Sequence, residues 1–164
     1  MPMFSLKRVV TVFGMSFLVC VNGLSQAPSP QNVQAFSGRW EGRKAMSQRG
    51  ASCTYSGGPT PYAVVLTIND DRSFIGELLF TEGARKGQKN LSETWMGEIL
   101  PDLHVRLAAQ KKSYCNGEEH TYSVIYSGQF SQKKGKYRLT LKGTDKTCPQ
   151  MQCVFESILD LEQK

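Results

Sequence analysis

From Phe36 onward, apolar and polar residues alternate along the chain in one short segment after another, and turn-forming residues separate the segments. Alternation with a period of two is typical of strands, because successive side chains of a strand point to opposite faces. The alternating segments are 36–43, 62–68, 74–80, 93–99, 103–109, 121–130, 136–142 and 154–161. This pattern predicts about eight antiparallel strands joined in chain order as a meander.

The connections between these segments differ in length and composition. Asn69–Ser73 would turn the second segment into the third, and Ser131–Gly135 would join the sixth to the seventh, so both predict hairpins. The longer connections are polar or rich in glycine and proline. We therefore expect loops at 51–61, 81–92, 111–120 and 144–152.

The number of strands constrains the fold class. An open sheet of about eight strands would leave two edges unpaired and one apolar face uncovered. Closure into a barrel removes the edges and buries the apolar faces of all strands together. The sequence therefore predicts an all-β fold, an antiparallel up-and-down meander that closes into a barrel, with a β-sandwich as the alternative. Trp40, Phe155, Leu159 and Leu161 are expected to face the core.

The start of the chain has the order of a secretory signal peptide. Two basic residues precede an uncharged apolar run, 9–21, and Gly23 and Ser25 supply the small side chains that cleavage after Ser25 requires. The run is shorter than the roughly 20 residues of a membrane span. We therefore expect a secreted or periplasmic protein with no stable membrane span after signal removal. A retained anchor and lipidation at Cys20 are the alternatives.

The same patterns divide the chain into three parts. Residues 1–25 form the expected signal peptide. The segment 26–35 is uncharged and has few large apolar residues, so we expect a flexible leader there. Residues 36–164 then form a single β-barrel domain, which is long enough to bury its own core.

Four cysteines remain after the expected cleavage, namely Cys53, Cys115, Cys148 and Cys153. An even number of cysteines in an exported domain predicts two disulfides, for which three connectivities are possible. We favour a local bridge between Cys148 and Cys153 and a long one between Cys53 and Cys115. A four-thiolate zinc site is the rival interpretation, but only one short ligand spacing is present.

Gly38-Arg39-Trp40, in the first strand of an eight-strand meander that follows a signal peptide, resembles the Gly-x-Trp signature of lipocalins and the wider calycin group. The resemblance implies a barrel in which Gly38 lets the chain bend at the closed end and Trp40 plugs that end. The late Thr-Asp-Tyr turn of lipocalins is matched only in part, by Thr144-Asp145-Lys146. The chain is similar as well to small secreted bacterial inhibitors of proteases and lysozymes, some of which begin with Gly-x-Trp.

Candidate catalytic residues are few. The chain has neither a Gly-x-Ser-x-Gly nor a His-Glu-x-x-His motif, and its two histidines are His104 and His120. Glu118-Glu119-His120 would lie in a polar connection, where solvated charge is the simpler interpretation than a metal or acid–base site. We therefore expect no enzymatic activity, no metal and no cofactor, and a hydrolase is the least favoured function.

Basic residues account for the net charge of +6, and several are clustered. The clusters at 85–89, 111–112 and 133–136 fall in expected loops or turns. They could meet an acidic partner, a membrane surface or a polyanion, although solubility and protection of strand edges are the favoured explanation. Nucleic acid is not an expected partner, because the chain is exported and has no recognisable binding motif.

Aromatic residues on the inward faces would either fill the core completely, which is the favoured outcome, or leave a cavity for a ligand, since an eight-stranded barrel is near the limit that side chains can fill. The expected lining consists of Phe74, Phe80, Trp95, Tyr122, Tyr126 and Tyr137. The sequence thus favours a secreted lipocalin-like protein that binds a small hydrophobic ligand. The alternative is an inhibitor or interaction protein that meets an extracellular protein through its cysteine-flanked loops.

Overall fold

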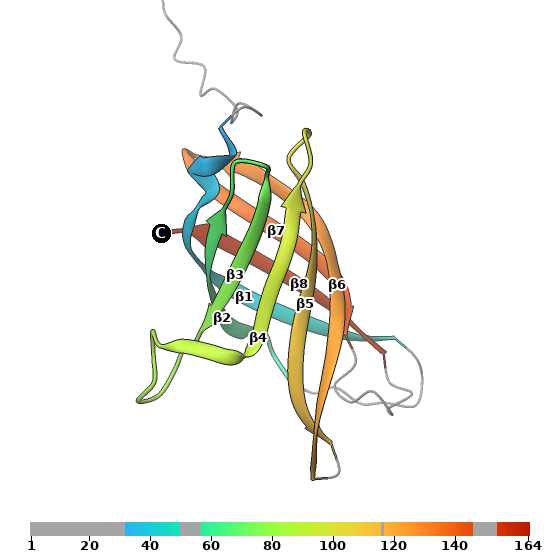
Figure 1. The fold of residues 1–164 in the computed structure, drawn as a ribbon. Coiled ribbons are helices and arrows are strands. Elements are labelled where there is room, and N and C mark those ends of the chain that lie inside the picture. The colour runs from blue at the N-terminus through green and yellow to red at the C-terminus, as the bar shows by residue number, and fades with distance from the viewer. Residues whose placement is uncertain (1–31, 50–56, 116, 146–153) are drawn as a thin grey trace, which may run out of the picture.

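A computed structural model describes residues 32–49, 57–115, 117–145 and 154–164 (Figure 1). Within these residues, strands form a closed antiparallel barrel in which each strand pairs with the next in the chain and the last pairs with the first. A short 3-10 helix, η1 (Val33–Phe36), precedes the barrel. The strands are β1 (Gly38–Arg49), β2 (Thr60–Ile68), β3 (Ser73–Leu79), β4 (Lys89–Ile99), β5 (His104–Cys115), β6 (Glu118–Lys133), β7 (Lys136–Asp145) and β8 (Val154–Gln163).

This topology confirms the predicted eight-strand meander and its closure into a barrel, so the sandwich alternative is wrong. The predicted alternation also holds, because Trp40, Phe155, Leu159 and Leu161 are all buried. Cys53, Cys148 and Cys153 lie outside the described residues, and so does the side chain of Cys115. Their predicted disulfides stay a prediction, as does the signal peptide in residues 1–25.

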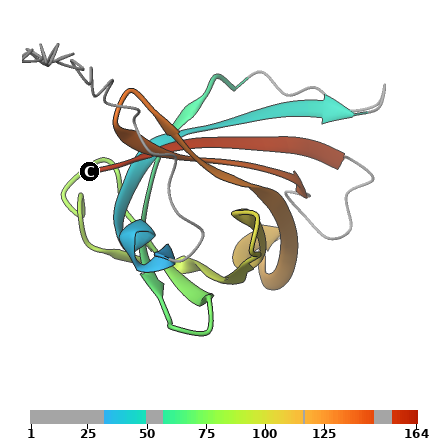
Figure 2. The same cartoon turned by 90° about the horizontal axis from the view of Figure 1, so that it is seen from above.

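Aromatic side chains fill one end of the barrel. Trp40 is fully buried, and its indole Nε1 donates a hydrogen bond to the carbonyl oxygen of Phe36 at 2.9 Å. The ring of Phe36 stacks on that of Phe130 with centroids 4.2 Å apart, and Tyr137 meets Phe36 edge-on. Gly38, the first residue of β1, has a φ of +120°, which residues with a side chain rarely adopt. Helix η1 lies at this end of the barrel (Figures 1 and 2).

The strands at the other end are longer than the sequence predicted. The expected loop 111–120 is wrong, because β5 and β6 continue through it and pair from Lys111 opposite Tyr122 to Cys115 opposite Glu118. Strand β4 likewise begins at Lys89, inside the expected loop 81–92. Polar side chains do not prevent strand pairing, because the backbone N–H and C=O groups of the two strands form hydrogen bonds with each other. In Figure 1 the β5–β6 hairpin projects beyond the barrel opposite η1.

Candidate functional site

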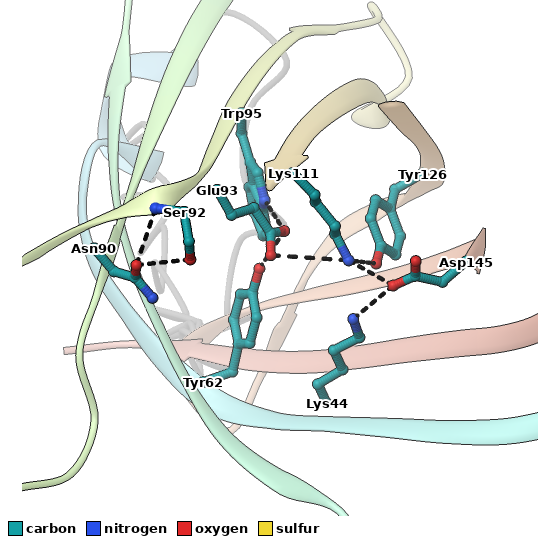
Figure 3. Close-up of polar contacts among 9 residues, drawn as sticks. All are labelled: Lys44, Tyr62, Asn90, Ser92, Glu93, Trp95, Lys111, Tyr126 and Asp145. Atoms are coloured by element: carbon teal, nitrogen blue, oxygen red, sulfur yellow. Dashed lines mark hydrogen bonds and ion pairs between the residues drawn. The ribbon is translucent and has the colours of Figure 1, made fainter. Parts of the chain in front are cut away.

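The barrel interior changes from apolar to charged toward the end opposite η1. Lys44 of β1, Glu93 of β4, Lys111 of β5 and Asp145 of β7 all point inward there (Figure 3). We call these four residues the charged cup. Their side chains are only 12%, 11%, 7% and 3% exposed, in that order. Charged groups this deeply buried are rare unless they are paired.

Strand alternation alone brings these residues inside. Lys111 follows the buried Ala109 by two positions, and Glu93 precedes the buried Trp95 by two. A strand repeats its facing every second residue, so both charged residues share the inward face with apolar neighbours. Glu93 and Lys111 are also direct partners across the β4–β5 pairing.

Asp145 holds the two lysines of the charged cup together. Its Oδ2 accepts a hydrogen bond from Lys111 Nζ at 2.6 Å and another from Lys44 Nζ at 2.9 Å. Lys111 Nζ also donates to the Tyr126 hydroxyl at 3.2 Å and lies 3.8 Å from Glu93 Oε2. Two cations and two anions therefore meet inside the barrel, and both ammonium groups share a single oxygen.

Glu93 connects the charged cup to the aromatic interior. Its Oε1 accepts hydrogen bonds from the Tyr62 hydroxyl at 2.6 Å and from Trp95 Nε1 at 2.9 Å. The rings of Tyr62 and Trp95 stack with centroids 5.8 Å apart, and Tyr126 lies 6.5 Å beyond Trp95. The carboxylate is thus fixed in place by two aromatic donors (Figure 3).

Burial and charge change the proton affinities of these groups in opposite directions. Burial would raise the pKa of Asp145, but the neighbouring Lys44 and Lys111 charges hold that pKa below its usual value. Burial opposes the charge on Lys111, yet Glu93, Tyr126 and Asp145 together raise its pKa. Burial and the Lys111 charge lower the pKa of Lys44. Lys111 and Asp145 form the stable ion pair, and Lys44 is the lysine that loses its proton more easily.

The charged cup opens into a cavity of about 230 Å³. Its wall consists of Lys44, Met46, Ser92, Glu93, Lys111, Lys112, Tyr122 and Asp145. Ser92 and Lys112 are exposed, so the cavity reaches solvent. Burial and the Asp145 charge raise the pKa of the Tyr122 hydroxyl to about 12, which keeps it protonated as a donor. Asp145 Oδ1 is buried and has no hydrogen-bond partner among the described residues.

Comparison with known proteins adds nothing to this geometry. No family model, curated protein or solved structure matches the chain. None of the helices in the described residues has the length and apolar character required to cross a membrane. The function therefore has to be inferred from the barrel and its charged cup.

The aromatic residues expected to line a cavity occupy four different places. Trp95 and Tyr126 lie directly against the charged cup, and Tyr122 forms part of the wall of its cavity. Phe74 is buried in the core. Two others lie apart, since Phe80 sits 5.8 Å under the Arg85 guanidinium and Tyr137 packs on Phe36 at the η1 end.

Sequence reasoning missed the charged residues of this site. The sequence pattern places Lys111 with Lys112 in a basic loop cluster, but Lys111 points into the barrel and is buried. The signal that could have found it is the inward alternation Val105, Leu107, Ala109, which Lys111 continues. Asp145 continues the inward alternation of Leu139 and Leu141 in the same way. From the sequence alone, however, an acidic residue is expected to be exposed to solvent.

The histidines do not form a site in the described part of the chain. His104 Nδ1 lies 2.9 Å from the exposed Asp102, and His120 Nε2 lies 3.9 Å from Glu118. The two residues lie at opposite ends of the β5–β6 pairing, where they face Gln129 and Ser113 respectively. No three His, Cys, Asp or Glu side chains within the described residues could together hold a metal ion.

Proposed function

We propose that this protein is an exported, lipocalin-like binding protein that takes a small organic anion, with a carboxylate or phosphate group, at the charged cup. The observation that carries the proposal is the meeting of Lys44 and Lys111 at one oxygen of Asp145 beside an open cavity. An ammonium group has three donors, and Lys44 Nζ uses one of them within the described residues. The remaining donors can bind an anion together with the Tyr122 hydroxyl.

Energetics favour a binding role over a purely structural one. Removing two ion pairs from water costs several kcal/mol per ion, and apolar side chains of similar volume often stabilise a protein as well or better. The rest of the barrel interior is mainly apolar and aromatic, with Ser157 as a further buried polar residue, so apolar side chains could fill the place of the charged cup as well. A ligand site, in contrast, requires a few fixed polar groups in a concave place.

The cavity size limits the ligand. About 230 Å³ is below the roughly 300–1,000 Å³ of sites for drug-sized molecules, which favours a small metabolite-sized anion. The aromatic rings of Tyr62, Trp95 and Tyr126 pack against one another next to the charged cup. Because these rings already contact one another, the ligand would lie beside the ring cluster and not between the rings.

Titration of the isotopically labelled mature protein with phosphate, citrate and benzoate, followed by amide chemical shifts, tests the proposal. We expect saturable shifts in β1, β5 and β7 around the charged cup, and at least ten-fold weaker binding in Lys44→Met, which keeps the Lys111–Asp145 pair. Lys134→Met, at the exposed β6–β7 turn near the other end, is the matched control. The proposal would be overturned if none of the three anions gave saturable shifts, or if Lys44→Met bound them as tightly as the wild-type protein.

A second candidate, an interaction protein that acts through its loops, is supported by the projecting β5–β6 hairpin. Tyr114 near its tip is 74% exposed, a large side chain available for contact. Inhibition assays against a panel of secreted proteases and lysozymes test this function. We expect inhibition by the wild-type protein that Tyr114→Ala weakens, whereas a lack of inhibition across the panel would reject it.

A further inference from the structure

An apolar row crosses the outer face of four neighbouring strands. Ile75 of β3 pairs with Met96 of β4, Met96 with Ala108 of β5, and Ala108 with Ile125 of β6. Directly paired residues lie on the same face of a sheet, so the four side chains are contiguous. Ile75, Met96 and Ile125 are 51%, 57% and 65% exposed. Single exposed apolar residues are ordinary, but a contiguous row marks an interaction surface.

The row has a projection beside a depression. Met96 is long, and its neighbour Ala108 is the smallest of the four side chains. The surface around Ala108, between Met96 and Ile125, forms a wide and shallow hollow of about 480 Å³. A methionine side chain presented by another molecule would fit this hollow.

One anion and one cation flank the hollow. Glu98 and Arg106 are cross-strand partners on β4 and β5, and both line the hollow. Neither forms a salt bridge to any residue that the structure describes. On the other side of the row, Gln110 and Ser123 are uncharged and hydrogen-bond to each other at 2.7 Å. On a basic protein, this face is therefore nearly neutral and carries complementary charges on adjacent strands.

We propose that a second copy of this chain docks on this face, related by a two-fold axis that runs parallel to β4 and β5 and between them. That operation places β4 of one copy over β5 of the other. Met96 then enters the hollow above the partner's Ala108, and Glu98 meets the partner's Arg106. Each contact occurs twice, as an isologous interface requires. Size and charge are thus matched by the same operation.

Sedimentation velocity of the mature protein over micromolar to millimolar concentrations tests this proposal. We expect a concentration-dependent dimer that Met96→Lys weakens at least ten-fold. Leu91→Lys is the matched control, because Leu91 lies on the same strand, is 70% exposed and lies outside the row. A protein that stays monomeric at every concentration, or a dimer unaffected by Met96→Lys, would overturn the proposal.

Charge reversal tests the orientation of the two copies. Glu98→Arg places two arginines opposite each other and is expected to abolish the dimer, as is Arg106→Glu. The double variant restores opposite charges across the interface and is expected to dimerise again. Failure of the double variant to dimerise, while circular dichroism shows that it is folded, would reject the proposed axis.

Discussion

Asp145 is the residue on which the charged cup depends, because a single oxygen of its carboxylate accepts hydrogen bonds from both Lys44 and Lys111. Burial of these lysines depends on such a partner, since an unpaired buried ammonium group is strongly unfavourable. Lys111 keeps a second carboxylate nearby in Glu93, whereas Asp145 is the one carboxylate to which Lys44 is paired within the described residues. The two lysines therefore differ in their dependence on Asp145.

Asp145→Ala is expected to lower the free energy of unfolding by about 3–5 kcal/mol, because it leaves buried charge uncompensated. Urea unfolding measures the change. The control replaces the whole cup at once, by Lys44→Met, Glu93→Gln, Lys111→Met and Asp145→Leu, and should be nearly as stable as the wild type or more stable. A loss below about 1 kcal/mol in Asp145→Ala would show that the ion pairs are already solvated.

Lys44 is expected to titrate below the usual lysine value of 10.5, because burial and the Lys111 charge both disfavour its ammonium form. Selective isotope labelling of lysine side chains allows its pKa to be followed by NMR. In Lys111→Met the pKa of Lys44 should rise, since one repulsive charge is removed while Asp145 remains. An unchanged pKa would mean that the two amines do not sense each other.

At the scale of elements, the seam between β1 and β8 closes the barrel, and its geometry requires a glycine. A side chain at Gly42 would place its Cβ 1.9 Å from the carbonyl oxygen of Asp160 on β8. Gly128 has the same relation to Thr140 across the β6–β7 pairing, at 1.8 Å. Close approach of neighbouring backbones at such points is typical of tightly bent strands.

Gly42→Ala is therefore expected to destabilise the protein by about 1–3 kcal/mol or more, because the seam must open to admit one methyl group. Thermal unfolding followed by circular dichroism measures the effect. Gly58→Ala is the control, since among the described residues no atom beyond its chain neighbours lies within 4 Å of the position its Cβ would take. Equal melting temperatures for the two variants would contradict this account of the seam.

At the scale of the whole molecule, the barrel is closed differently at its two ends. Aromatic side chains and η1 fill one end, where Trp40 donates a hydrogen bond to the carbonyl oxygen of Phe36. Charged and hydroxyl groups occupy the other end, and their ionisation is coupled to folding because they are buried. The stability of the molecule therefore depends on pH mainly through one end.

Stability should fall on both sides of neutral pH. The pKa of Asp145 lies below its usual 3.8, so its contribution is present above that pH and is lost as the pH falls through the folded value. Burial raises the pKa of Tyr62 above 10.0, further supported by Glu93, and burial raises that of Tyr126. Their contributions are present below about pH 10 and are lost above it.

Urea unfolding across the pH range is expected to give a plateau from about pH 5 to about pH 9. The lowered pKa of Lys44 favours the folded protein as the pH rises, so it reduces the alkaline loss of stability without reversing it. The raised pKa of Lys111 adds to the alkaline decline, so Tyr62→Phe should make that decline shallower without abolishing it, and should leave the acid decline unchanged. A free energy of unfolding that keeps rising above pH 10 would show that ionisation of the tyrosines does not destabilise the folded protein.

The amino-acid sequence alone determined the meander and the inward apolar residues, Trp40 among them, because a period of two assigns each side chain to a face without knowledge of its partners. The choice of a barrel over a sandwich, the true ends of β5 and β6, and the meeting of Lys44, Glu93, Lys111 and Asp145 were decided by the tertiary structure. These four residues come from four strands, up to 101 positions apart for the Lys44–Asp145 pair. Local pattern cannot place such residues together, because only the register around a closed barrel brings their side chains to one level of its interior.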